Sequence, residues 1–132
     1  MDFSAPAEIA TAASPLRDRH EIPDRFKWNL AHIYSDWSAW QAAYDELERK
    51  IGAYAALQGT IADGADRLLA AMKLSDDIGQ LTYKVWYFAS LKYDEDQRDN
   101  SINARKQQIQ ALLARWQQAT SWFSRELLTI PL

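Results

Sequence analysis

The sequence predicts an all-α protein, and three observations support this fold class. Apolar residues recur at spacings of three and four over long stretches, which is the period of an amphipathic helix. No two alternating apolar runs stand on either side of a tight turn, so no strand pairing is predicted. A length of 132 residues fits one domain that buries roughly two-thirds of its unfolded surface. We therefore expect three long helices in an antiparallel bundle.

The N-terminal part is expected to hold a tail and an arm. Residues 1–24 contain three of the four prolines among Ala, Ser and Thr, and they predict a flexible tail. The helical domain is then expected over residues 25–132. An alternating pattern followed by a tight turn predicts an extended arm over residues 25–34, laid across the helices with its aromatics as anchors. Its apolar residues are Phe26, Trp28, Leu30, Ile33 and Tyr34.

The first helix is expected to run from Trp37 to about Leu57. Ser35 or Asp36 would cap it by accepting hydrogen bonds from the free amides of the first turn, and Gly59 would stop it. Its apolar residues fall on one stripe, while its charged residues mostly lie elsewhere. This stripe consists of Trp37, Trp40, Tyr44, Leu47, Ile51 and Tyr54.

The second helix is expected from Gly64, capped by Asp63, to about Leu91. At roughly 100° per residue, its apolar residues form two stripes on nearly opposite sides. One stripe holds Leu68, Leu69, Met72, Tyr83, Trp86 and Tyr87, and the other holds Leu74, Ile78, Leu81, Val85 and Phe88. Two apolar faces favour one long central helix between neighbours. A break near Ser75 stays open as the alternative, because polar residues and a glycine follow it.

The third helix is expected to start after Asp96, with Asp99 at its third position, where a carboxylate suits the positive end of the helix dipole. Pro131 disfavours a helical conformation at Ile130, so this helix should not continue through that point. The expected stripe is Ile102, Ile109, Leu112, Leu113, Trp116, Ala119, Thr120 and Phe123.

Composition argues against several classes of function. The net charge is −3, from 15 basic and 18 acidic residues, and the basic residues are scattered, so no nucleic-acid partner is expected. The chain lacks cysteine, which leaves no thiolate metal site and favours a cytoplasmic location. No apolar run approaches the ~20 residues of a membrane span, and no signal peptide is recognisable. We expect no membrane association.

Neither histidine predicts a metal or catalytic site. His20 is followed by Glu21, but a zinc motif needs a second imidazole four residues after the first. Asp24 stands there, and Pro23 interrupts the helix that such a motif requires. His32 is isolated, and a lone imidazole beside aromatic residues more often packs or hydrogen-bonds than binds a metal.

An acidic cluster precedes the third helix and consists of Asp94, Glu95, Asp96 and Asp99. An EF-hand loop starting at Asp94 would need Gly and Glu at positions that Asp99 and Arg105 occupy. We interpret the cluster as a helix cap with charges that match the helix dipole. No catalytic, cofactor-binding or metal-binding residue is therefore predicted. Some of the six Trp and six Tyr residues should nevertheless remain on a binding surface.

Several short patterns over residues 25–132 resemble one known family. They are Trp28, Leu30 and Tyr34; the Trp-bearing first helix and Gly59; Tyr87, Leu91 and Asp96; and Ser121-Trp122-Phe123 before Glu126-Leu127-Leu128. Together they resemble the N-terminal helical region of oligoendopeptidase F, a zinc metallopeptidase. Members of that family cleave short peptides in a deep channel between helical halves, and their N-terminal region forms part of the channel wall.

The resemblance implies a non-catalytic domain that is inactive alone. The family's catalytic helix carries His-Glu-x-x-His, and no position here matches it. No cofactor is therefore expected in this chain, and the zinc of the full-length family would be bound by residues absent here. The implied partners are the catalytic remainder and its peptide substrate. The alternative is a stand-alone helical interaction module that covers its apolar face by self-association or on another protein.

Overall fold

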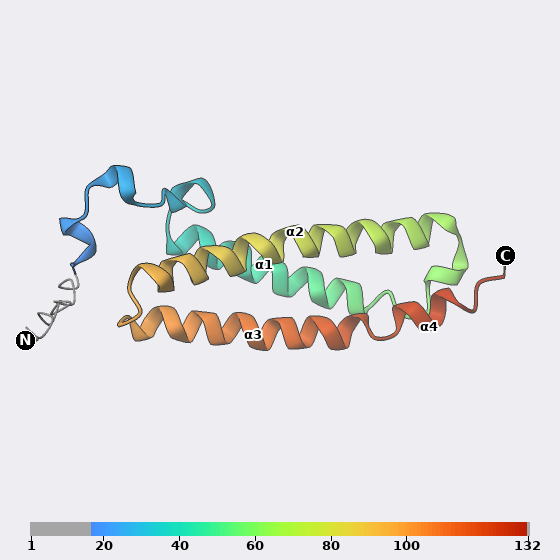
Figure 1. Cartoon of the computed structure of the whole chain (residues 1–132). Coiled ribbons are helices and arrows are strands. Elements are labelled where there is room, and N and C mark those ends of the chain that lie inside the picture. The colour runs from blue at the N-terminus through green and yellow to red at the C-terminus, as the bar shows by residue number, and fades with distance from the viewer. Residues whose placement is uncertain (1–16, 132) are drawn as a thin grey trace, which may run out of the picture.

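The computed structural model describes residues 17–131, and between its turns this part of the chain is helical (Figure 1). Three long helices dominate: α1 (Trp37–Ala55), α2 (Ala65–Glu95) and α3 (Asn100–Thr120). A short helix, α4, follows over Phe123–Leu127. No strand occurs among the described residues, so the all-α class is confirmed. Most of the expected tail lies outside the described residues.

The three long helices lie side by side, and each runs in the direction opposite to the preceding one (Figure 1). Each packs against the other two. One hydrophobic core is shared by all three, because each places one apolar stripe toward the common axis. The most deeply buried side chains of this core are Trp40, Leu47, Ile61, Ile78, Val85, Phe88, Ile109 and Leu112.

Helix α2 is continuous across Ser75, so the alternative of two shorter helices is wrong. Ile78 and Val85 lie in the core beyond the suspected break, and their burial holds the helix together there. The expected cap is wrong, because Asp63 ends the 3₁₀ turn η4 (Ile61–Asp63) and Gly64 is the N-cap. Ile61 is only 1% exposed, so its burial keeps η4 against the core and delays the start of α2.

Aspartates cap the other two long helices. Asp36 accepts a hydrogen bond of 2.8 Å from the Ala39 amide, as expected for the start of α1. Asp99 accepts bonds from the amides of Ser101 (2.8 Å) and Ile102 (3.4 Å). Asp99 is thus the N-cap of α3 and not its third residue, because a short side chain reaches these amides only from the cap position.

The segment ahead of α1 is not extended, which corrects the expected arm. It contains the 3₁₀ turns η1 (Arg19–Glu21), η2 (Asp24–Phe26) and η3 (Leu30–His32). In a 3₁₀ turn the side chains repeat every third residue, so an alternating pattern no longer places them on one side. Phe26 in η2 and Trp28 between η2 and η3 are 68% and 54% exposed, whereas Leu30 is buried at 6%. Leu30 anchors this segment, together with Ile33 and Tyr34, which pack against the core.

Among the polar contacts between distant parts of the chain, those of Trp40 and Glu126 position the helices and their connections. In the core, the indole Nε1 of Trp40 donates to the carbonyl oxygen of Val85 at 2.9 Å. In the loop after α1, the carboxylate of Glu126 accepts from the amides of Gly59 (2.7 Å) and Ile61 (3.0 Å). Gly59 has a φ of 85°, a left-handed conformation that glycine adopts without strain. Glu126 therefore fastens α4 to the α1–α2 connection.

Helix α3 ends earlier than its apolar stripe suggests. The stripe was expected to reach Phe123, but the helix ends at Thr120 and the chain turns before α4. This turn brings Trp122 into the core at 5% exposure, with its ring 5.4 Å from that of Tyr54. Burial of a large indole thus accounts for the break. α4 ends at Leu127, before the position that Pro131 was expected to keep non-helical.

Candidate interaction surface

The two histidines lie at the surface in separate 3₁₀ turns. His20 is exposed in η1, where the neighbouring Glu21 accepts a bond of 3.0 Å from the Asp18 amide. His32 is exposed in η3, with its Nε2 3.0 Å from the side-chain nitrogen of Asn29. Among residues 17–131, no three His, Cys, Asp or Glu side chains are grouped so as to hold a metal ion.

The acidic cluster is divided between two helix ends. Asp99 caps α3, whereas Asp94 and Glu95 lie in the last turn of α2. The expected match with the helix dipole is wrong for these two, because the carboxyl end of a helix is negative and disfavours acids. Basic side chains offset this. Glu95, whose side chain is 6% exposed, pairs with Arg19 and Lys92.

Asp96 follows α2 and is held by Arg98. The guanidinium of Arg98 approaches both of its carboxylate oxygens at 2.8 and 3.0 Å, and the Arg98 amide donates at 3.0 Å. These hydrogen bonds, with the side-chain bond contributing most, lower the pKa of Asp96 to about 2. Glu95, Asp96 and Asp99 are therefore engaged in ion pairing and capping.

The aromatic residues divide between core and surface, as their number led us to expect. Trp40, Tyr54 and Trp122 are buried. Tyr83 and Tyr87, on α2, are 66% and 48% exposed, and their rings stack at 5.6 Å with an interplanar angle of 16°. This stacked, exposed aromatic pair thus stands on the side of α2 that α1 and α3 do not cover.

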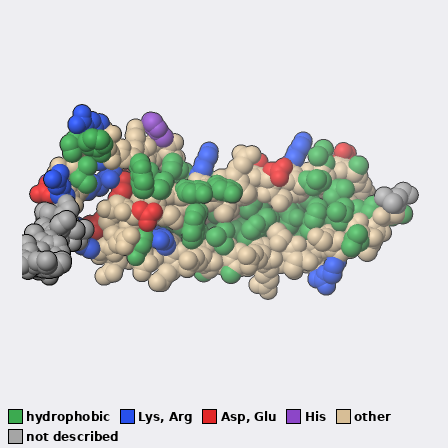
Figure 2. Space-filling model, in the orientation of Figure 1, with side chains coloured by type: hydrophobic (Ala, Val, Ile, Leu, Met, Phe, Trp, Pro, Cys, Tyr) green, Lys and Arg blue, Asp and Glu red, His purple; other side chains and the backbone are tan. Residues whose placement is uncertain are grey.

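The outer stripe of α2 consists of Leu69, Met72, Tyr83 and Tyr87. Leu69 and Met72 are 49% and 51% exposed. On a helix of 3.6 residues per turn, these positions fall on the side opposite the buried Ile78 and Val85. Hydrophobic side chains also gather along the middle of the face shown in Figure 2, between the lines of α2 and α3. Outside α2, Leu127 at the end of α4 and the following Leu128 are also exposed, at 39% and 86%.

This arrangement suits binding to another surface. Leu69 and Met72 form one exposed apolar pair near the start of α2, and Tyr83 and Tyr87 form a second one further along. The exposed polar residues Asp76 and Gln80 lie between the two pairs. Exposed apolar side chains on one side of a helix are a usual feature of a face that packs on a partner. No described helix is long and apolar enough to cross a membrane. The outer stripe was one of two apolar faces visible in the sequence, but the sequence did not tell which of them would stay uncovered.

Comparison with curated proteins identifies the relatives of this chain. Oligoendopeptidase F, plasmid, of Lactococcus lactis subsp. cremoris is 25% identical over 115 residues, or 86% of this chain. Oligopeptidase PepF of Bacillus subtilis (strain 168) is 24% identical over 118 residues, or 89% of the chain. The chain is related to the oligoendopeptidases F. A third relative, group B oligopeptidase PepB of Streptococcus agalactiae serotype III (strain NEM316), is 24% identical over 113 residues.

The relationship covers most of this chain but little of the relatives. The aligned residues make up 19% of the Lactococcus and Streptococcus proteins and 18% of the Bacillus protein, so the chain spans about a fifth of the length of the curated relatives it matches. No family model matches the chain, and no solved structure matches it significantly. The comparisons therefore show that this helical chain is related to one part of the oligoendopeptidases.

Proposed function

We propose that this chain is the N-terminal, non-catalytic helical domain of a cytoplasmic oligoendopeptidase F-like zinc metallopeptidase. In this role it forms part of the wall of the channel in which short peptides are hydrolysed. The observation that carries the proposal is the coverage of the alignment, because 86% of this chain corresponds to only 19% of the Lactococcus oligoendopeptidase. The remaining four-fifths of such a protein would supply the chemistry.

The residues of this chain do not fit a zinc centre. Zinc in peptidases is held by imidazole and carboxylate side chains, with two histidines one helical turn apart. The chain has two histidines, and they lie in different 3₁₀ turns with no third ligand grouped beside them in residues 17–131. We therefore assign zinc binding and catalysis to residues outside this sequence and derive no catalytic step from this chain.

The exposed outer stripe supports the proposal, because it offers apolar side chains that can pack against another part of a protein. Within a larger peptidase, Leu69, Met72, Tyr83 and Tyr87 would lie against the rest of the protein. About 25 cal/mol is gained per Å² of apolar surface removed from water, so covering four such side chains would hold the domain in place. The same stripe also favours the second candidate, a stand-alone interaction module, and the experiment must separate the two.

The test is a replacement in a relative. The aligned fifth of the Bacillus oligopeptidase PepF is either deleted or replaced by this chain, and hydrolysis of a short quenched-fluorescence peptide is measured. We expect the chimera to hydrolyse the peptide at least about tenfold faster than the deletion variant, because the chain restores the confinement of the substrate. Equal activity of the two proteins would contradict the peptidase role.

A second measurement uses the outer stripe. The chain is added in trans to the purified deletion variant, either as wild type or with Met72→Lys and Tyr83→Lys. We expect only the wild-type chain to bind, because lysine on this face cannot be buried without losing its hydration. The chain alone should bind no stoichiometric zinc and hydrolyse no peptide. A module that binds other proteins but never the deletion variant would favour the second candidate.

A further inference from the structure

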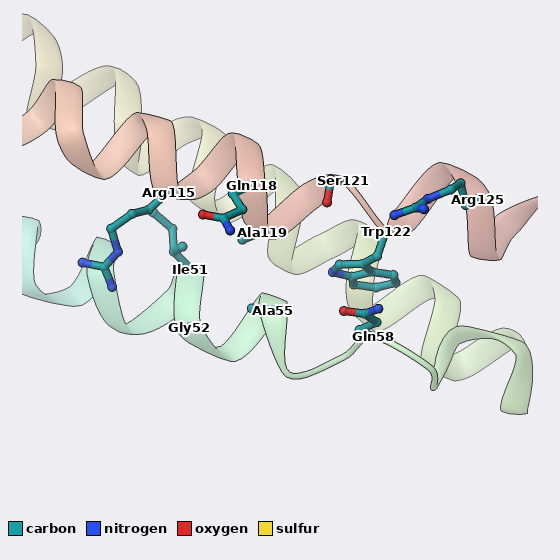
Figure 3. A pocket seen from close by; sticks show the side chains of 10 residues that line it. All are labelled: Ile51, Gly52, Ala55, Gln58, Arg115, Gln118, Ala119, Ser121, Trp122 and Arg125. Carbon is teal, nitrogen blue, oxygen red and sulfur yellow. The ribbon is translucent and has the colours of Figure 1, made fainter.

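A groove of about 430 Å³ lies between α1 and the junction of α3 with α4 (Figure 3). Its floor is built from small residues, namely Gly52 and Ala55 on α1 and Ala119 on α3. A Cβ atom placed on Gly52 would meet nothing within 4 Å, so this floor is open. The groove lies on other helices than the outer stripe of α2, and a partner on that stripe would not need to cover it.

The charged groups that line this groove are basic. Arg115 and Arg125 line it, and no Asp or Glu does so. Arg115 is engaged, because it pairs with Glu48 and its guanidinium points away from the middle of the groove (Figure 3). Arg125 forms no ion pair with a described residue. Its side chain lies back along the groove toward Trp122 (Figure 3).

Trp122 supplies an unsatisfied donor at the same place. Its side chain is 5% exposed, and its indole Nε1 is buried without a hydrogen-bond partner in the described structure. Figure 3 shows the ring over Gln58 with its nitrogen turned toward the middle of the groove. An unpartnered buried N–H is unfavourable, and a carbonyl oxygen of a ligand would satisfy it. This donor is independent of the small floor and of the arginines.

We propose that this groove binds the C-terminal end of a short peptide. The carboxylate lies on the guanidinium of Arg125, since the planar fork of arginine matches a carboxylate with two parallel hydrogen bonds. The last apolar side chain lies on the floor at Gly52, and a backbone carbonyl of the peptide accepts from Trp122. Gln58 and Gln118 also line the groove, and their amides can both donate to and accept from a peptide bond.

The test observes Trp122 directly in the full chain. The chain is labelled with ¹⁵N, and the indole resonance of Trp122 is assigned by its loss in Trp122→Phe. N-acetyl-Ala-Ala-Leu with a free carboxylate is titrated against its C-terminal amide. We expect a saturable shift with the acid and at least about tenfold weaker binding of the amide, because the amide cannot accept the two parallel charge-assisted hydrogen bonds from Arg125. This experiment needs no peptidase, so its result is separate from that of the proposed function.

Two variants and one control complete the test. Arg125→Gln should weaken the acid about tenfold, to the level of the amide, and Gly52→Leu should abolish binding by filling the floor. Gly79→Leu is the matched control, because Gly79 is also helical with nothing within 4 Å of an added Cβ, and it should bind normally. Circular dichroism checks that each variant keeps its helices.

Four outcomes would overturn the proposal, and the fourth needs a further peptide. The first is equal affinity for the acid and the amide, and the second is unchanged affinity in Arg125→Gln. The third is the absence of any saturable shift up to about 10 mM, which is weaker than the binding of a specific site. The amide of N-acetyl-Ala-Glu-Leu separates a side-chain carboxylate from a terminal one. If it binds as tightly as the free acid, the assignment to a peptide C-terminus is wrong.

Discussion

The two faces of α2 carry similar side chains in opposite surroundings. Toward the core, Ile78 and Val85 are fully buried and Phe88 is 1% exposed. On the outer stripe, Tyr83 and Leu69 are 66% and 49% exposed. Both faces recur with the period of a helix, so the period does not distinguish them. What distinguishes them is the presence of α1 and α3 on one side only.

The comparison shows that an apolar stripe on a helix predicts burial of that face. It does not tell whether the same chain or another protein buries it. The inner face is covered within the chain, and its packing stabilises the fold. The outer face contributes little to the fold of this chain, and under the proposed function it is kept apolar for contact with the rest of a larger protein. Removing side chains from the two faces should therefore have unequal effects on stability and on association.

The largest effect is expected from Phe88→Ala on the inner face. The ring of Phe88 lies edge-on to those of Tyr34 at 5.6 Å and Trp37 at 5.0 Å. Its removal leaves a cavity and should lower the free energy of unfolding by about 3–5 kcal/mol. Tyr83→Ala on the outer stripe should change it by less than about 1 kcal/mol. Urea unfolding followed by tryptophan fluorescence measures both free energies. Similar midpoints in the two variants would show that the two faces of α2 contribute equally to stability.

A smaller loss of stability is expected when Glu126 is replaced. Its carboxylate connects α4 to the α1–α2 loop. Glu126→Ala leaves the amides of Gly59 and Ile61 without their acceptor and should lower the free energy of unfolding by about 1–3 kcal/mol. Glu48→Ala is the control, because its ion pair with Arg115 is solvent-exposed and such pairs contribute about 0–1 kcal/mol. Equal losses in the two variants would mean that the loop contact is not specific.

An effect on association without loss of stability is expected on the outer stripe. The isolated chain should self-associate at micromolar concentration, because its exposed apolar side chains find each other in the absence of a partner. Met72→Lys with Tyr83→Lys should shift it toward monomer while the thermal midpoint stays within a few degrees. Multi-angle light scattering measures the mass. A wild-type chain that stays monomeric at high concentration would contradict this prediction.

The smallest effect is expected from Asp96→Asn and depends on pH. The pKa of Asp96 is lowered from 3.8 to about 2 by hydrogen bonds from Arg98. A carboxyl group whose pKa is lower in the folded state stabilises the fold above its unfolded pKa, and this contribution is lost as the pH falls through its folded pKa. Wild type should therefore be slightly more stable than Asp96→Asn at pH 7, and the difference should vanish near pH 2.

Salt provides the control for that measurement. The Asp96–Arg98 contact is solvent-exposed, and exposed charges are screened when the ionic strength rises. The difference between wild type and Asp96→Asn at pH 7 should shrink in about 1 M NaCl. Thermal unfolding by circular dichroism measures both dependences, and a difference that persists unchanged at pH 2 would place its origin elsewhere.

The helices and their buried faces could be predicted from the sequence because both follow from a period. Leu47, Ile78 and Ile109 recur with the right spacing, and all three are fully buried. The cap at Asp36 was predictable for the same reason, since a capping side chain acts within one turn. At Asp99 the same rule placed the residue inside the helix instead of at its cap, because helix ends shift with local hydrogen bonding.

The segment before α1 and the candidate site depend on long-range contacts that a single sequence does not contain. Phe26 and Trp28 were expected to be anchors, but both are exposed in a segment that is not extended. Trp122 was not part of the expected stripe, yet the end of α3 at Thr120 brings it against Tyr54, and its sequence neighbours give no sign of this. The groove beside it joins residues from α1, α3 and α4 that are far apart along the chain, so it becomes visible only in the folded structure.

The hydrogen bond from Trp40 to the carbonyl of Val85 has a consequence for motion. A slide of α1 along α2 by one helical turn, about 5.4 Å, would carry the indole away from its acceptor and leave a buried donor unpaired at about 1–3 kcal/mol. The hydrogen bond therefore favours one register of α1 relative to α2. A change in the relative position of α1 and α2 along their axes therefore requires this buried hydrogen bond to break.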